Sequence, residues 1–126
     1  MVLTQDRSKR KLSGGRYTVQ RLKRKFRMGR TPILTTIGKT KAKSVRCAGG
    51  NIKRKLQHAE KVNVFNPKTK KSSVETIKTV LESPANRHFV RRNIITKGAV
   101  IETSKGKAKI MNRPSQEGSI NAILLE

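Results

Sequence analysis

Hydrophobic and polar residues alternate through much of the C-terminal two-thirds of the chain, a pattern typical of β-strands with one buried face. Glycine, proline and asparagine residues separate these stretches at intervals of roughly eight to twelve residues. The predicted strands are residues 43–48, 51–58, 62–65, 73–81, 94–96, 99–102, 107–111 and 119–125. This spacing predicts a mainly β fold, a small antiparallel β-barrel.

The first two strands are predicted to form a hairpin around Gly49 and Gly50, because a two-residue glycine loop favours a tight turn. Counted from that loop, the opposed pairs are Cys47–Ile52 on an apolar face, and Arg46–Lys53 and Ser44–Lys55 on a basic face. In the strand over residues 73–81, alternation places Ile77, Thr79 and Leu81 on one face.

One short helix, over residues 84–92, interrupts the strands. Ser83 is a suitable N-cap, because its hydroxyl can accept a hydrogen bond from a free backbone N–H, and Pro84 suits the first helical position. Phe89 is the one large apolar anchor, and Asn93 tolerates the left-handed conformation that ends many helices. The helix would present three arginines and His88 from a rigid base.

Positive charge is concentrated toward the N-terminus. Residues 1–61 hold 19 of the 31 Lys and Arg residues but two of the seven acidic ones. A flexible, glycine-rich segment lies at Ser13-Gly14-Gly15-Arg16, and a dense basic run follows over residues 21–30. These segments contain too few apolar residues to form a hydrophobic core. We therefore predict a basic extension over residues 1–42 that is disordered until bound, and a β-barrel body over residues 43–126.

The net charge of +24 indicates a polyanionic partner, because few soluble proteins tolerate such self-repulsion alone. Nucleic acid is the first candidate, and an anionic membrane is the second. We expect no membrane span or signal peptide, since no apolar run has the required length. The single cysteine, Cys47, is typical of a reducing, intracellular setting. Four aromatic residues supply few platforms for base stacking.

No catalytic or metal-binding set can be assembled. Gly38-Lys39-Thr40 resembles the end of a phosphate-binding loop, but Ile33 stands where that motif requires a glycine. One cysteine and two histidines are too few for a structural metal site, and a Ser-His-Asp triad would have only Asp6. We therefore expect no enzyme activity, no cofactor, no metal and no small-molecule substrate.

Short motifs spread over nearly the whole chain point to a known family. They are Ser13-Gly14-Gly15-Arg16, Lys23-Arg24-Lys25, Gly29-Arg30, Gly49-Gly50-Asn51, Asn63-Val64-Phe65, the run over residues 84–99, Ile101-Glu102-Thr103 and Asn121-Ala122-Ile123-Leu124-Leu125. Together they resemble the S8e family of small-subunit ribosomal proteins, which is of eukaryotic and archaeal type. Eukaryotic members carry a large insertion in the body, so its absence indicates an archaeal-type member.

The resemblance implies a structural, non-enzymatic constituent of the small (30S) ribosomal subunit in the cytoplasm. Its partners would be small-subunit ribosomal RNA and neighbouring small-subunit proteins, and its barrel would carry an arm threaded into RNA. Two alternatives remain open: a ribosome-assembly factor with a related C-terminal domain, and a basic DNA-compacting protein.

The predicted RNA-binding residues fall into three groups. In the extension they are Lys9, Arg10, Lys11, Gly14, Gly15, Arg16, Arg21, Lys23, Arg24, Lys25, Arg27, Arg30 and Lys39. On the hairpin they are Arg46, Asn51, Lys53 and Lys55, and in and after the helix they are Arg87, His88, Arg91, Arg92 and Lys97. Lysine and arginine neutralise phosphates, and glycine lets the chain pass close to an RNA backbone. Alternatively, the helix arginines pair with Glu75, Glu82 or Glu102 and stabilise the body.

Overall fold

A computed structural model of the chain describes residues 7–18 and 24–125. The chain divides into two compact units, Met1–Pro32 and Ile33–Glu126, which are described separately below. The division falls between residues 32 and 33 rather than between residues 42 and 43. The reason is that two strands within residues 35–46 pair with the body, although their sequence is as basic as the segment before them.

The first unit contains a small turn within residues 9–17. The N–H of Lys11 donates to the carbonyl of Gly15 (2.7 Å), and the N–H of Gly14 donates to the carbonyl of Lys11 (3.0 Å). Gly14 has a φ of 84°, which a residue with a Cβ rarely adopts. A 3-10 turn, η1 (Lys25–Arg27), follows. No buried hydrophobic residue is found among the described residues of this unit, so its structure rests on local hydrogen bonds.

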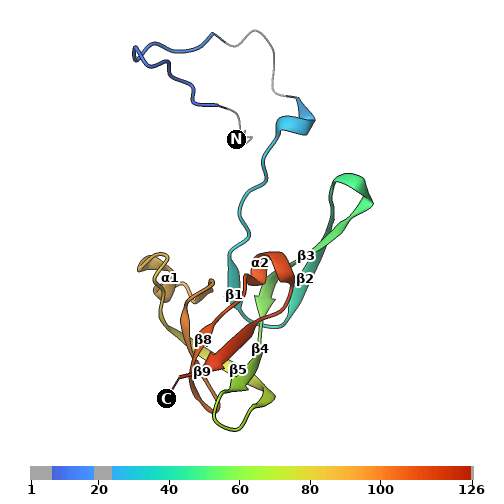
Figure 1. Cartoon of the computed structure of the whole chain (residues 1–126), viewed down its shortest axis with the longest axis vertical. Coiled ribbons are helices and arrows are strands. Elements are labelled where there is room, and N and C mark those ends of the chain that lie inside the picture. Colours follow the sequence, from blue (N-terminus) through green and yellow to red (C-terminus); the bar gives the residue numbers. More distant parts are fainter. Residues whose placement is uncertain (1–6, 19–23, 126) are drawn as a thin grey trace. The chain divides into compact units, whose positions relative to one another are not determined.

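The second unit, the body, is built mainly of short strands (Figure 1). In chain order its elements are β1 (Thr35–Ile37), β2 (Lys41–Arg46), η2 (Ala48–Gly50), β3 (Ile52–Ala59), β4 (Lys61–Asn66), β5 (Lys71–Glu82), α1 (His88–Arg91), β6 (Ile94–Ile95), β7 (Val100–Thr103), β8 (Gly106–Ile110), α2 (Pro114–Glu117) and β9 (Asn121–Leu124). Strands β4, β5, β7, β8 and β9 close into a barrel, and a separate sheet has the order β2-β3-β1-β6. The prediction of a mainly β fold with a small barrel is confirmed.

One parallel pairing closes the barrel. Strand β4 runs antiparallel to β5 but parallel to β9, with Asn63 opposite Asn121. The side-chain amide of Asn63 donates to Oδ1 of Asn121 at 3.0 Å, on the outer surface of this pair. Strand β1 is likewise parallel to β3 and antiparallel to β6, so β1 occupies an interior position in the four-stranded sheet.

The barrel strands supply most of the core by alternation. On β8, Ala108 and Ile110 are fully buried, whereas Lys107 and Lys109, which alternate with them, are exposed. Ile101 of β7 is also fully buried, and the remaining core residues follow the same rule on the neighbouring strands. Burying an isoleucine or valine side chain contributes about 1.5–3 kcal/mol to the free energy of folding, so these core positions supply the main favourable term.

The longest strand, β5, departs from simple alternation. Its pairing with β7 shifts between Ile77 and Thr79 and again between Val80 and Glu82. Because each shift inserts an extra residue, Val80 packs in the core with 4% exposure, whereas Leu81 is 36% exposed. The prediction that Ile77, Thr79 and Leu81 share one face is therefore wrong. Bulges of this kind bend a strand, and β5 pairs with β4 over its first half and with β7 over its second.

The loop of the β2–β3 hairpin is longer than predicted. The N–H of Cys47 donates to the carbonyl of Asn51 at 2.7 Å, and η2 forms the turn between them. Gly49 and Gly50 have φ angles of 71° and 76°, so both glycines are needed, but in a three-residue loop. The predicted two-residue loop is wrong, and β3 is displaced by one residue relative to β2.

That displacement exchanges the faces of the hairpin. Arg46 lies opposite Ile52, so it is on the other face from Lys53, whose partner is Val45. Ile52 is 69% exposed and does not join Cys47 in an apolar face. The predicted pairs Cys47–Ile52, Arg46–Lys53 and Ser44–Lys55 are therefore corrected to Arg46–Ile52, Val45–Lys53, Ser44–Arg54 and Lys43–Lys55.

The helix α1 is shorter than predicted because an asparagine turn replaces its first half. Oδ1 of Asn86 accepts the N–H of His88 at 2.9 Å, and the helix begins only at His88. Ser83 does not cap it, and its hydroxyl has no hydrogen-bond partner among the described residues. Asn93 ends the helix in the left-handed conformation, as predicted, with a φ of 48°.

A second short helix, α2, was not predicted. It begins at Pro114, and Gly118 caps its end in the left-handed conformation with a φ of 79°. A Cβ built on Gly118 would lie 2.8 Å from Cβ of Arg54 in β3. Only glycine therefore allows the end of α2 to pack this closely on the hairpin.

Candidate nucleic-acid interface

The basic residues of the first unit are exposed around its turn. The described residues with exposed side chains include Lys9, Arg10, Lys11, Arg16, Arg24, Arg27 and Arg30. The guanidinium of Arg10 donates to the carbonyl of Gly14 at 2.8 Å, and the guanidinium of Arg7 lies 3.9 Å from the centroid of the Tyr17 ring. The predicted residues Arg21 and Lys23, and the side chain of Lys25, lie outside the described part of the chain.

Three lysines share one face of the hairpin, and we call them the lysine ribbon: Lys43, Lys53 and Lys55. Lys43 lies directly opposite Lys55, and Lys53 is the next residue on the same face of β3. Like charges placed directly opposite each other destabilise a strand pair. Among the described residues none of the three lysines forms an ion pair, so no carboxylate of that part of the chain relieves the repulsion. The arrangement is suited to a polyanion.

The hairpin projects from the rest of the body (Figure 1). Its inner end is held by Leu56 and Ala59, which are 3% and 1% exposed, and by the contact between Arg54 and Gly118. Asn51, which is predicted to bind RNA, also stabilises the turn, because its side-chain amide donates to the carbonyl of Ala48 at 3.2 Å.

The basic residues of α1 form a second exposed group, the α1 cluster: Arg87, His88, Arg91 and Arg92. Arg87 has helical backbone angles, so one helical turn separates it from Arg91. The segment is fixed to the body by β6, whose residues Ile94 and Ile95 are 0% and 2% exposed, while Phe89 is half-buried. The structure thus places the predicted arginines together on a short helix next to a buried strand.

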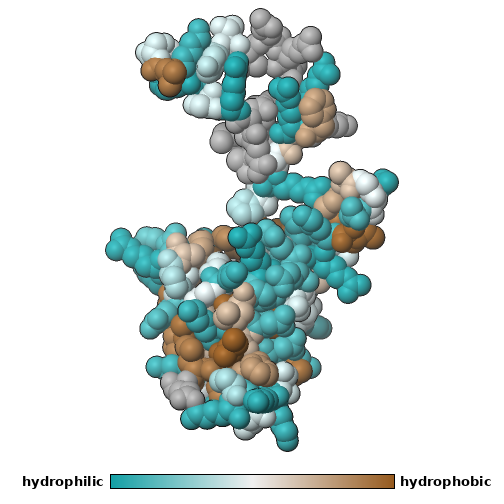
Figure 2. All heavy atoms as spheres, in the orientation of Figure 1, coloured by the Kyte–Doolittle hydropathy of each residue, from teal (hydrophilic) through white to brown (hydrophobic). Residues whose placement is uncertain are grey.

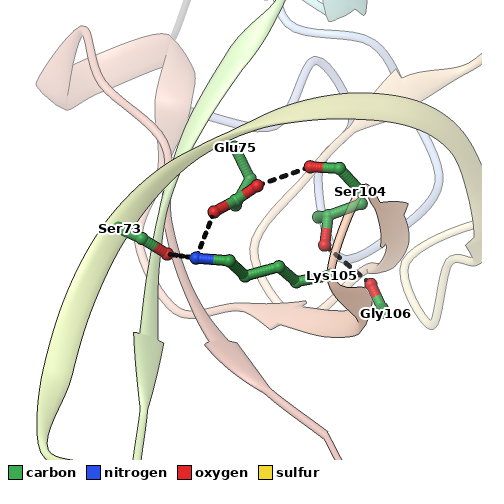
Figure 3. Close-up of polar contacts among 6 residues, drawn as sticks. Ser73, Glu75, Ser104, Lys105 and Gly106 are labelled. Atoms are coloured by element: carbon green, nitrogen blue, oxygen red, sulfur yellow. Dashed lines mark hydrogen bonds and ion pairs between the residues drawn. The ribbon is translucent and has the colours of Figure 1, made fainter.

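The described residues offer no support for the alternative that these arginines pair with carboxylates. Within that part of the chain none of the α1 arginines forms an ion pair. Glu75 instead contacts Lys105 at 2.7 Å and accepts a hydrogen bond from Ser104 (Figure 3). Glu102 accepts a hydrogen bond from Thr79 at 3.2 Å.

The Glu75 network ties the β7–β8 turn to β5. Lys105 also donates to the hydroxyl of Ser73 at 2.9 Å, and Figure 3 shows both of its partners on β5. Hydrogen bonds from Lys105, then from Ser104 and Ser73, lower the pKa of Glu75 to about 2. Lys105 therefore has a structural role, unlike the lysines of the ribbon.

Lys97 does not belong to the α1 cluster. Its charge contributes to lowering the pKa of Glu117, after the larger effects of hydrogen bonds from the side chain of Asn112 and the backbone of Arg113. Lys97 is exposed, but it lies close enough to Glu117 of α2 to interact with it electrostatically. Lys39 is exposed in the turn between β1 and β2.

Lys43 is the member of the ribbon that the sequence prediction missed. The predicted register places Lys43 on the apolar face, together with Cys47 and Ile52. The alternation of lysine at residues 41 and 43, and again at residues 53 and 55, was the available signal.

Figure 2 shows hydrophilic atoms over most of the body near the hairpin and α1, while apolar atoms gather over β8 and β9. Exposed apolar residues on or beside the barrel strands include Phe65, Met111 and Leu125. No described helix has the length and apolar character needed to cross a membrane. The residues described in the structure include no group of three or more His, Cys, Asp or Glu side chains placed to hold a metal ion.

Comparisons with known proteins agree with the resemblance in the sequence motifs. The sequence matches the ribosomal protein S8e family over residues 4–125. It is 47% identical to the small ribosomal subunit protein eS8 of Methanocorpusculum labreanum, over 99% of this chain and 100% of the relative. It is 48% identical to the protein of the same name from Methanococcoides burtonii, over 97% of this chain and 98% of the relative. The chain therefore belongs to the ribosomal protein S8e family.

Proposed function

We propose that this protein is a structural constituent of the small ribosomal subunit in the cytoplasm and that it binds and stabilises folded ribosomal RNA. Its partners are small-subunit RNA and neighbouring small-subunit proteins. The observation that carries the proposal is the combination of family membership over nearly the whole chain with two exposed cationic groups, the lysine ribbon and the α1 cluster, that form no ion pair among the described residues.

The mechanism is electrostatic and structural. Lysines and arginines of the N-terminal extension neutralise phosphates where RNA segments crowd together, with release of counterions. The lysine ribbon supplies compact charges, whereas the arginines of the α1 cluster also offer planar, bidentate contacts to phosphates and base edges. Because the ribbon and α1 are fixed to a folded body, their side chains lose less conformational entropy on binding than those of an extension without a core.

Sedimentation of the tagged full-length chain with small subunits tests the proposal. A structural constituent remains on mature particles at near-stoichiometric amounts after a high-salt wash. An assembly factor is found only on immature particles and is washed off the mature ones. Competition between folded small-subunit RNA and duplex DNA at physiological salt tests the DNA-compacting alternative, which requires a preference for DNA.

A further inference from the structure

Positive charge is unevenly distributed across the four-stranded sheet. Strands β2 and β3 carry six lysines and arginines, whereas the sequences of β1 (TTI) and β6 (II) contain none. In the strand order β2-β3-β1-β6, the two charged strands are neighbours at one edge of the sheet, and the two uncharged strands are neighbours at the opposite edge. The α1 cluster immediately precedes β6, so it lies at the end of the sheet opposite to the hairpin.

The two cationic groups are also separated in distance. Thr36 of β1 lies opposite both His58 of β3 and Ile94 of β6. Lys55 and Lys53 are three and five residues before His58. With strands spaced about 4.8 Å apart and a rise of about 3.3 Å per residue, the two lysines lie about 14 Å and about 19 Å from Ile94. Residues 56–59, β1 and β6, which lie between the two groups, contain no lysine or arginine.

A carboxylate and a packed helix lie in the region between the two groups. Helix α2 packs on β3 through Gly118 and Arg54, and Figure 1 shows it between α1 and the hairpin. Glu117 of this helix lies near Lys97, two residues after β6, and its pKa is lowered in part by that lysine. Between the two groups, therefore, β1 and β6 carry no charge, and the carboxylate of Glu117 offsets the nearby positive charges of Lys97 and Arg113.

From these observations we infer that the body contacts two separate RNA segments and holds them at a fixed distance. The lysine ribbon binds the phosphates of one segment, and the α1 cluster binds the other. The inference rests on the proposed function, since it takes RNA as the partner. RNA fits both groups because the cations of each group repel one another and form no ion pair with a carboxylate of the described residues. The closely spaced phosphates of an RNA backbone would offset this repulsion.

Hydroxyl-radical footprinting of small-subunit RNA with the full-length protein tests the inference. Three variants each remove three positive charges: a ribbon variant, a helix variant and a barrel control. The ribbon variant carries Lys43→Gln, Lys53→Gln and Lys55→Gln. The helix variant carries Arg87→Gln, Arg91→Gln and Arg92→Gln. The barrel control carries Lys61→Gln, Lys78→Gln and Lys109→Gln. The control changes exposed lysines on strands β4, β5 and β8. Thermal unfolding verifies that each variant is folded before the footprint is read.

We expect the ribbon variant and the helix variant to lose protections in two non-overlapping RNA segments, while the control keeps both. Each of the two should also bind at least about tenfold more weakly than the control, as expected for lost charge-assisted contacts. Loss of the same protections in both variants, or no loss in one of them, overturns the inference but leaves the proposed function standing. Failure of the unmodified protein to protect any RNA instead overturns the proposed function, and the inference with it.

Discussion

Replacing Lys43 with glutamate should stabilise the protein and weaken its binding to RNA. Lys43 lies directly opposite Lys55 in the hairpin, so the change converts a like-charge pair into an opposite-charge pair. Such cross-strand pairs are worth roughly 0.2–1 kcal/mol each, so the full change contributes about 0.5–1.5 kcal/mol to the free energy of unfolding. For a body of this size, that gain raises the Tm by about 2–12 °C. Lysine and glutamate have similar strand propensities, which leaves the charge as the main difference.

RNA binding should change in the opposite direction. Loss of a charge-assisted contact costs about 1.5–3 kcal/mol, so the Kd for small-subunit RNA should rise by about ten- to a hundredfold. The slope of log affinity against log salt should become shallower by about one. Thermal unfolding at low salt and filter binding at several salt concentrations measure the two effects. Added salt should reduce the gain in Tm, because the two side chains are exposed or half-buried.

Lys109→Glu is the matched control. Lys109 lies opposite Val100 on one side and Ile123 on the other, so the variant has the same change in net charge without removing a like-charge pair. A gain in Tm of equal size in both variants would show that net charge, and not the Lys43–Lys55 pair, sets the stability. Unchanged RNA affinity in Lys43→Glu would refute the assignment of the ribbon to RNA.

The other predictions concern the whole chain, the first unit, one carboxylate and one glycine. With about ten phosphates engaged, the slope of log affinity against log salt should be −7 to −9, and a slope shallower than about −3 would mean that charge does not dominate binding. Limited trypsin digestion of the free protein should cut after Arg30 and spare Lys41, because residues 41–46 are paired in the sheet; mass spectrometry of a fragment beginning at residue 42 would contradict this. Glu75→Gln should make the free energy of unfolding less dependent on pH at acid pH. The ionised carboxylate stabilises the fold fully above pH 4.5, the usual pKa of the group, and this contribution is lost as the pH falls toward the lowered pKa of about 2. Equal slopes of stability against pH in both proteins would contradict the Glu75 network. Gly118→Ala should destabilise the fold by about 1–3 kcal/mol, more than Gly98→Ala, which has a similar φ but nothing within 4 Å of its Cβ; equal losses in chemical denaturation would show that contact with the hairpin costs nothing.

Local rules were sufficient for the end of α1 and for the buried face of β8. Asn93 was expected to end the helix in the left-handed region, and it does. The alternation of Lys107, Ala108, Lys109 and Ile110 was expected to turn two residues inward, and both are fully buried. Barrel formation followed from the number and spacing of such strands.

The hairpin register was not decided by local rules. Gly49 and Gly50 are compatible with loops of two or three residues, and the choice depends on what each face of the hairpin contacts. Leu56 is buried in the body, and the backbone of Arg54 packs on the turn at Gly118. These contacts join residues far apart in the sequence, so they select the register only in the folded body. The same holds for β5, whose bulges are needed to pair with two different neighbours.

The small number of acidic residues explains why the lysine ribbon and the α1 cluster form no ion pair among the described residues. Glu75 and Glu117 are engaged in hydrogen bonds at turns of the body, and Glu102 accepts a hydrogen bond from a neighbouring strand. Glu75, Glu102 and Glu117 are three of the chain's seven acidic residues, which stand against 31 basic ones. The lysine ribbon and the α1 cluster are thus left without an ion pair among the described residues, on elements that are fixed to the body by apolar contacts elsewhere. A rigid cationic surface of this kind gains most of its interaction energy only when a polyanion is present. Under the proposed function, the phosphates of RNA supply the negative charge that these elements lack.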